Sequence, residues 1–223
     1  MNANKLLAIA LLIILTGGTC LAQQHLTSYD LAKILSANGF STTNRKVNAL
    51  PNHERNGVAL SAEQGDGMAW LNGVTFANGI IELDMRGKNV EQQSFLGIAF
   101  HSLTDTKTMD VIYFRPFNFL AADSVKRSHS VQYASHPEYP WQVLREKFNG
   151  QYEKDIKSTP NPNEWFHVRV EVNYPQLKVF VNGSTVPSLV VKKLNERKSG
   201  LLGLWAGNNS DGAYANLRVT FSE

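Results

Sequence analysis

Apolar and polar residues alternate with a period of two along most of the chain beyond residue 57. The segment 165–173, WFHVRVEVN, shows this most clearly, because apolar and polar residues take turns along it. Successive side chains of a β-strand point to opposite faces, so the pattern predicts strands with one buried and one solvated face. Comparable segments, separated by turn residues, are 58–62, 68–71, 80–86, 131–134, 177–181, 201–206 and 213–221, beside a hairpin over 95–119.

About ten strands and few helices predict an all-β fold, in which two antiparallel sheets pack as a jelly-roll sandwich. One short helix is expected near the N-terminus, over Leu26 to Asn38, capped by Thr27 or Ser28. Prolines and polar residues predict long loops over 135–141 and 149–163. The strand signals continue without a break, and therefore predict a single β-sandwich domain over residues 23–223.

Residues 1–22 are predicted to be a signal peptide rather than part of the fold. Leu6 to Leu15 is an unbroken apolar run, too short to cross a bilayer. Small residues at Cys20 and Ala22 predict cleavage after Ala22. A lipid anchor on Cys20 is the less favoured alternative, because Thr19 fits a lipoprotein signal poorly. The protein is therefore expected to be exported, to the periplasm or beyond the cell.

The charge distribution and the cysteine content exclude several classes of partner and site. The 223-residue chain has a formal net charge of +3, and its basic residues are scattered. Nucleic-acid binding needs a concentrated basic stripe, so no nucleic-acid partner is expected. Cys20 is the only cysteine, so the exported domain should have no disulfide and no cysteine-based metal site. We expect no cofactor, no metal and no membrane span.

The hairpin over 95–119 carries the first candidate site. Its two strands flank a polar turn at 102–108. The predicted register makes three pairs across the turn, which are Ala99 with Val111, Gly97 with Tyr113, and Phe95 with Arg115. These side chains and His101 share one face, while Ile98 and Ile112 lie on the core face. Small residues beside an aromatic ring and a fixed cation predict a groove on a concave sheet face.

Within this hairpin, we expect Asp110, Tyr113 and Arg115 to bind a polar ligand bearing hydroxyl or carboxylate groups. His101 is the candidate catalytic residue, because it is the one group on that face that titrates near neutral pH. The alternative is an exposed sheet face stabilised by cross-strand and cation–π pairs.

Two further clusters hold aromatic and polar residues. The first lies in the irregular region and consists of His129, Tyr133, His136, Glu138 and Trp141. Functional groups on loops favour a binding role, and the alternative is a loop that buries its aromatic residues for packing. The second consists of Trp205, Asn208, Asn209 and Asp211. An exposed tryptophan beside amides holds a sugar ring, whereas a buried one followed by an ordinary turn has no such role.

Glu82 and Asp84, in IIELDMRG, alternate along one strand face. Paired carboxylates suit glycoside hydrolysis, and the strand resembles the Glu-x-Asp-x-x-Glu signature of a jelly-roll glucanase family. Gly87 stands where the last acid belongs, so that hydrolytic mechanism is not supported.

Several longer segments carry a family resemblance. They are GDGMAWLNGVTFANGIIELDMRG, SFLGIAFH, MDVIYFRPFNF, EWFHVRVEV, LKVFVNG and GLLGLWAGNNSDGAYANLRV, and they cover most of 66–219. Together they resemble the concanavalin A-like lectin/glucanase superfamily, and within it the secreted bacterial domain called a 3-keto-disaccharide hydrolase or laminin-G-like domain. The resemblance implies that the protein binds or acts on polysaccharides or glycosides outside the cytoplasm. The resemblance does not assign a catalytic role to any residue of this sequence.

Two functional hypotheses follow. The first is an exported sandwich that binds a carbohydrate or glycoside on a sheet face, with hydrolysis as an open question. The second is a non-catalytic adhesion or interaction module. A sugar site needs an accessible aromatic residue flanked by hydrogen-bonding groups, whereas an interaction module would present a broad apolar patch.

Overall fold

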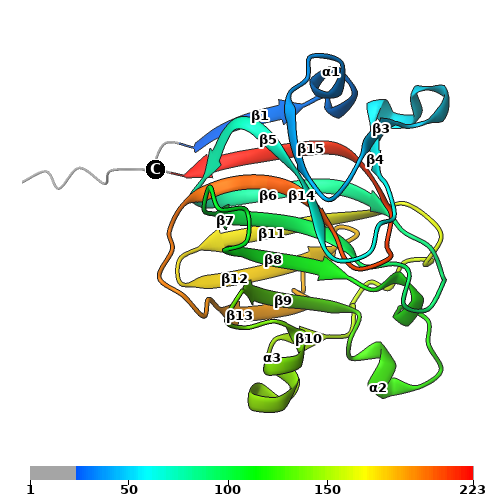
Figure 1. Cartoon of the computed structure of the whole chain (residues 1–223). Helices are drawn as coiled ribbons and strands as arrows, with labels where there is room; N and C mark the ends of the chain where they lie inside the picture. The colour runs from blue at the N-terminus through cyan, green and yellow to red at the C-terminus, as the bar shows by residue number, and fades with distance from the viewer. Residues whose placement is uncertain (1–23, 223) are drawn as a thin grey trace, which may run out of the picture.

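Two antiparallel sheets lie face to face in a computed structural model that describes residues 24–222 (Figure 1). We call them sheet A and sheet B. Sheet A has the order β13 (Leu189–Lys192), β12 (Gln176–Val181), β11 (Phe166–Asn173), β6 (Asn78–Arg86), β15 (Gly212–Ser222), β4 (Val58–Leu60) and β3 (Val47–Ala49), and β1 (Gln24–Tyr29) also pairs with β15. Sheet B has the order β10 (Glu153–Lys154), β9 (Val131–His136), β8 (Met109–Phe114), β7 (Leu96–Ser102), β14 (Gly200–Ala206), β5 (Gly67–Phe76) and β2 (Phe40–Thr43). The predicted all-β sandwich is confirmed.

The core lies between the two sheets and follows the predicted alternation. In β6, Ile81, Leu83 and Met85 are fully buried, and the polar residues between them face outward. Ile98 and Ile112 of sheet B pack into the same cluster from the other side. Complete burial of one such side chain contributes roughly 1.5 to 3 kcal/mol, so this layer is the main source of stability.

The predicted N-terminal helix is present only in part, because its first four residues belong to strand β1. β1 pairs along its whole length with β15, and helix α1 (Leu31–Ser36) begins only afterwards. Its cap is Asp30, whose carboxylate accepts a hydrogen bond from the amide of Lys33, rather than Thr27 or Ser28. Pairing with β15 supplies backbone partners over 24–29 that a helix cannot take at the same time.

The central strands of sheet B are buried on both faces, which the alternation does not predict. Every residue of β7 and β8 is buried. A second cluster covers the outer face of sheet B and includes Trp70, Val111, Tyr113 and Trp205. Leu144 of helix α3 (Trp141–Phe148) packs against it, in a segment next to one predicted loop. The other helical segments are η1 (Pro51–Asn56), η2 (Pro116–Asn118) and α2 (Ser124–Arg127).

No helix within residues 24–222 is long and apolar enough to cross a membrane. The predicted signal peptide, its cleavage site and Cys20 lie outside the described residues.

Candidate functional site

A cavity of about 720 Å³ opens on the outer face of sheet B, and we call it the groove. Its floor comes from β8, β9 and β14, and its walls come from the strand ends, α3 and the loops near α2. The residues that line it are Asp66, Glu91, Gln92, Phe95, Tyr113, Arg115, Phe117, Asn118, Lys126, His129, Ala134, His136, Pro140, Trp141, Gln142, Arg145, Trp205, Gly207, Asn208 and Asn209. Its volume is typical of a site for a small ligand.

The floor follows the predicted hairpin register. Gly97 pairs with Tyr113, and Ala99 pairs with Val111. A Cβ atom at Gly97 would lie 2.1 Å from the carbonyl oxygen of Ile112, so only glycine allows this close approach of the two strands. The rings of Tyr113 and Trp205 lie 5.0 Å apart at the floor of the groove. Both rings are almost covered, so they shape the floor rather than project into it.

Arg115 lines the groove but is only 4% exposed. Its guanidinium donates to the Tyr113 hydroxyl at 2.8 Å, to the carbonyl oxygen of His129 at 2.7 Å and to the side-chain oxygen of Gln132. The alternation along the hairpin predicts this cation on an exposed face. Instead, the guanidinium of Arg115 donates its hydrogen bonds to groups of the protein, and it thereby holds Tyr113 and Gln132 in place.

Glu153 of β10 connects the groove floor to α3. Its carboxylate receives two hydrogen bonds of 2.9 Å from Arg145, and lies 2.9 Å from the His129 ring and 3.6 Å from Arg115. Burial alone would raise the pKa of Glu153, but the hydrogen bonds and charge of Arg145, joined by Arg115 and His129, hold it below the usual range. Desolvation lowers the pKa of His129, and Glu153 opposes this.

The accessible side chains at the entrance are suited to a polar ligand with apolar faces. Trp141 is 43% exposed, and the Arg145 guanidinium lies 5.0 Å from the centre of its ring system. Asn208 lies at the opposite wall, where its side-chain oxygen accepts a hydrogen bond from the amide of Gly65 at 2.7 Å. Aromatic faces and amide groups are the elements with which proteins hold sugar rings.

Asp66 and His136 both line the groove, and their pKa values move in opposite directions. Desolvation by the surrounding walls raises the pKa of Asp66, although its carboxyl group stays accessible, and the charge of His136 opposes the change. Desolvation also lowers the pKa of the half-buried His136, and Asp66 opposes it. A carboxyl group that holds its proton more firmly and an imidazole that stays neutral form a candidate acid and base.

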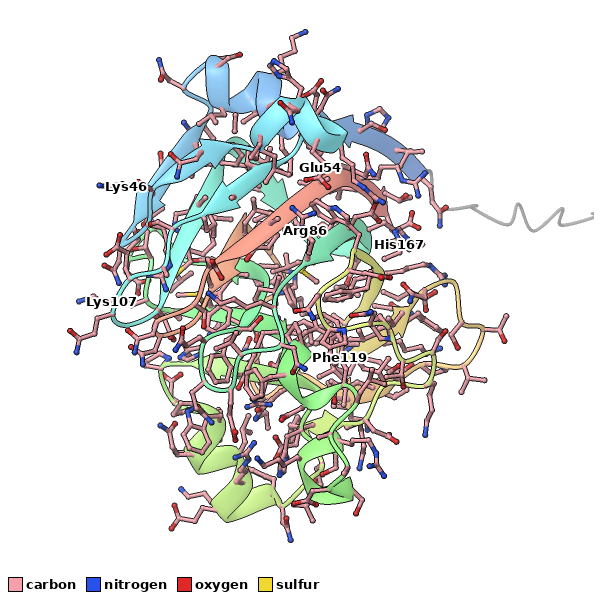
Figure 2. All side chains as sticks on the ribbon, turned by 90° about the vertical axis from the view of Figure 1, so that its right-hand side faces the viewer. Lys46, Glu54, Arg86, Lys107, Phe119 and His167 are labelled. Atoms are coloured by element: carbon pink, nitrogen blue, oxygen red, sulfur yellow. The ribbon has the colours of Figure 1, made fainter. Side chains whose placement is uncertain are left out.

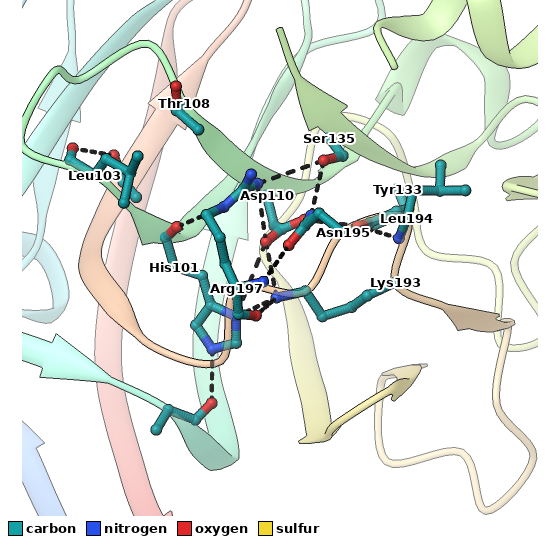
Figure 3. Close-up of polar contacts among 12 residues, drawn as sticks. His101, Leu103, Thr108, Asp110, Tyr133, Ser135, Lys193, Leu194, Asn195 and Arg197 are labelled. Atoms are coloured by element: carbon teal, nitrogen blue, oxygen red, sulfur yellow. Dashed lines mark hydrogen bonds and ion pairs between the residues drawn. The ribbon is translucent and has the colours of Figure 1, made fainter. Parts of the chain in front are cut away.

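The expected position of His101 on the groove face is wrong. His101 adopts a φ of 49°, which interrupts the extended backbone and turns its ring toward the sandwich interior. There its Nε2–H donates to the carbonyl oxygen of Ala77 at 2.7 Å, and its Nδ1 faces Lys193 (Figure 3). The ring has no exposed surface, so His101 does not reach the groove.

Asp110 and Tyr133 also lie away from the groove, in the same buried network (Figure 3). The Tyr133 hydroxyl donates to Asp110 at 2.6 Å, and Lys193 and Arg197 lie 3.0 and 3.3 Å from the other carboxylate oxygen. Asn195 donates to the first oxygen at 2.6 Å. This network joins the loop after β13 to sheet B, and its charged groups contact one another rather than the groove.

The groove therefore brings together six candidate ligand-binding residues, which are Tyr113, Arg115, His129, Trp141, Trp205 and Asn208. Asp66 carries no sequence signal of its own, because it stands in an ordinary Gly-Asp-Gly turn. His136 stands in the predicted loop cluster with Trp141. Glu153 and Gln132 support the floor from beneath, and alternation alone does not distinguish them from solvated polar residues.

A second polar cluster lies on the outer face of sheet A, where Figure 2 shows Glu54, Arg86 and His167. Asp84 accepts hydrogen bonds from His167 at 2.9 Å, Arg55 at 2.6 Å and Asn216 at 2.7 Å. The hydrogen bond to Asp84 raises the pKa of His167, and a cavity of about 480 Å³ adjoins the pair. Each charge faces an opposite charge of the protein, which is the arrangement of a solvated ion-pair network.

A protein-family model described as a 3-keto-alpha-glucoside-1,2-lyase-like domain matches residues 33–220. The chain belongs to this family. The match covers every residue of the groove and both sheets apart from β1 and the end of β15, and it confirms the family resemblance that the sequence segments indicate. No curated protein matches the chain.

Solved structures show the same fold at low sequence identity. The carbohydrate-binding module CBM66 from Bacillus subtilis has a TM-score of 0.59 at 14% identity, over 81% of this chain and 95% of that one. A protein with a galectin-like fold from Bacillus subtilis has a TM-score of 0.59 at 11% identity, over 88% of this chain and 95% of that one. The exoplasmic/lumenal domain of VIP36, in its Ca²⁺/Man3GlcNAc-bound form, has a TM-score of 0.52 at 11% identity, over 83% and 84%. These likenesses support a concanavalin A-like sandwich, and they concern the fold alone.

Proposed function

We propose that the groove binds a glycoside and catalyses a proton-transfer step on it. The observation that carries the proposal is one cavity that is lined by Asp66 and His136, whose pKa values move in opposite directions, and also by Trp141 and Asn208. Trp141 stacks on an apolar sugar face, and the amide of Asn208 bonds ring hydroxyls. Binding alone would not need an acid and a base.

The family description suggests the reaction, which is elimination across C1 and C2 of an α-glucoside whose C3 is a ketone. The ketone acidifies the neighbouring C2–H. Neutral His136 removes that proton, and the electron pair moves onto the C3 ketone as an enolate. Collapse of the enolate then restores the ketone and forms the C1=C2 double bond. The C1–O bond breaks with its electrons on the leaving oxygen, to which Asp66 gives a proton. The cations Lys126 and Arg145 line the same cavity and stabilise the enolate that develops at C3.

The test uses 4-nitrophenyl α-glucoside oxidised at C3, from which turnover releases nitrophenolate. We expect His136→Gln to lower kcat/KM for this substrate by roughly 100-fold to 10,000-fold, the range for general acid–base catalysis. Asp66→Asn should cause a loss of that size with a disaccharide oxidised at C3, whose leaving sugar oxygen needs a proton, and a much smaller loss with the nitrophenyl substrate, whose leaving group needs none. His25→Gln and Asp155→Asn are matched controls on exposed positions outside the groove, and should retain full activity. Full activity in both groove variants would refute the acid–base roles. Binding of the glycoside without turnover would instead make the protein a carbohydrate-binding module.

We propose further that the protein is exported and acts outside the cytoplasm. The support is the apolar run Leu6 to Leu15 followed by small residues at Cys20 and Ala22. Mass spectrometry of protein recovered outside the cytoplasm should give a mature form that begins at Gln23. A form that retains lipidated Cys20 would instead favour the anchored alternative.

A further inference from the structure

A second cavity of about 480 Å³ adjoins the groove, and we call it the side pocket. Its lining includes Asn89, Ala121, Ala122 and Asp123. Four residues line both cavities, namely Glu91, Phe117, Asn118 and Lys126. The two spaces therefore meet along one shared wall, and a ligand that fills the groove reaches the side pocket by passing these four residues.

The shared wall contains both fixed and movable side chains. Phe117 packs edge-to-face on Phe95 with ring centres 5.3 Å apart, and Asn118 is only 5% exposed. Glu91 and Lys126 form an ion pair of 2.8 Å whose two side chains are 61% and 50% exposed. An exposed pair of this kind is weak and is screened by salt, so it opens easily for a ligand. The fixed part of the wall thus offers an aromatic ring and a buried amide on which a second sugar unit can rest.

Both walls of the side pocket are anchored to the rest of the sandwich. The amide of Asn89 donates to the Asn163 side chain at 2.8 Å, and the amide of Lys88 donates to the Ser94 hydroxyl at 3.0 Å. On the other wall, the guanidinium of Arg127 donates to the carbonyl oxygens of Ala121 and Ala122 at 2.7 and 2.8 Å. The side pocket is therefore formed by restrained backbone, which favours a preformed subsite.

We propose that the site takes glycosides with an extended aglycone, whose first sugar lies in the groove and whose next units lie in the side pocket. This inference rests on the proposed function of the groove and adds the length of its substrate. Phe117 and Asn118 are the residues that contact the unit at the junction. A substrate with a small aglycone leaves the side pocket unfilled.

The experiment measures kcat/KM for maltooligosaccharides of two to six units, each oxidised at C3 of the non-reducing glucose. We expect kcat/KM to rise about tenfold once the chain reaches the side pocket, which corresponds to about 1.4 kcal/mol. Ala122→Trp, at an exposed position, fills the side pocket and should remove this gain while the nitrophenyl substrate keeps its kcat/KM. Ala62→Trp, also exposed but outside both cavities, is the matched control and should behave as the wild type.

Two outcomes would overturn the inference and leave the proposed function standing. One is a kcat/KM that does not depend on chain length, and the other is an Ala122→Trp variant that lowers kcat/KM equally for all substrates. If neither the nitrophenyl glycoside nor any oligosaccharide binds or reacts, the proposed function itself fails, and the substrate-length inference fails with it.

Discussion

Acidification should destabilise the protein through His101. The ring is buried as the neutral form, with Nε2–H donating to the carbonyl oxygen of Ala77 and Nδ1 facing the ammonium of Lys193. Burial, and then the charge of Lys193, lower the pKa of His101 from 6.5 to about 4, against the opposing influence of Asp110. A second proton on this ring would place another buried cation beside Lys193 and Arg197.

The direction and size of the effect follow from proton linkage. Between pH 6.5 and pH 4 the unfolded chain carries a proton on this imidazole, and the folded protein does not. Stability therefore falls as the pH falls through this window, because protons stabilise the state that binds more of them. A pKa difference of this size corresponds to about 3 kcal/mol, lost progressively from pH 6.5 and fully lost below pH 4.

The assay is urea denaturation followed by tryptophan fluorescence at several pH values between 8 and 4, for the wild type and for His101→Gln. Glutamine keeps one donor for the Ala77 carbonyl and one acceptor for Lys193, and it does not titrate. Other titrating groups, including His129 and His136, contribute equally to both proteins and cancel in the difference. We expect the wild type to lose about 3 kcal/mol more than the variant as the pH falls. Parallel profiles for the two proteins would refute the assignment of a neutral buried His101.

Three further predictions concern the sheet that carries the groove. Glu153→Gln should lower the free energy of unfolding by roughly 3 to 5 kcal/mol, because it leaves the buried cation Arg115 without its counter-charge; an unchanged urea midpoint would contradict this. Gly97→Ala should destabilise by roughly 1 to 3 kcal/mol or more through overpacking against the neighbouring strand, and thermal unfolding should show it as a lower Tm. Ile112→Ala should cost roughly 2 to 5 kcal/mol in stability while kcat/KM of the folded fraction stays normal, since this side chain faces the core.

Local alternation is enough to predict most of sheets A and B. In β7 and β8 the alternation assigns each side chain to a face, and the observed pairing of Ile98 with Ile112 agrees with that assignment. The alternation assigns side chains to the wrong face of the sheet where a residue leaves the extended conformation. His101 at φ 49° and Asn216 at φ 54° are such positions, and both lie in strands that the sequence predicts as regular. The neighbouring residues contain no pattern that predicts these left-handed conformations.

The groove is harder to predict than the fold because its walls come from distant segments. Asp66 precedes β5 and His136 ends β9, and three strands separate β5 from β9 in sheet B. Six of the predicted ligand-binding residues line the cavity. The sequence pattern that predicts them is the occurrence of aromatic and amide side chains near the ends of strands. Burial of Arg115 by Glu153 could not be predicted, because the pairing of β10 with β9 rests on two residues and has no pattern of its own.

The position of β15 decides when this protein can fold. The last strand of the described chain lies inside sheet A, where it pairs with β6 on one side and with β4 and β1 on the other. Until residues 212–222 leave the ribosome, the N-terminal strands of sheet A have no connection to β6, and Ala215, Leu217 and Val219 are missing from the core. Folding must therefore wait for synthesis of the whole domain, and contacts between the first and last strands make it slow. The same arrangement makes β15 suitable as a separate complementing peptide, since a chain that ends at residue 211 presents a vacant slot for one strand.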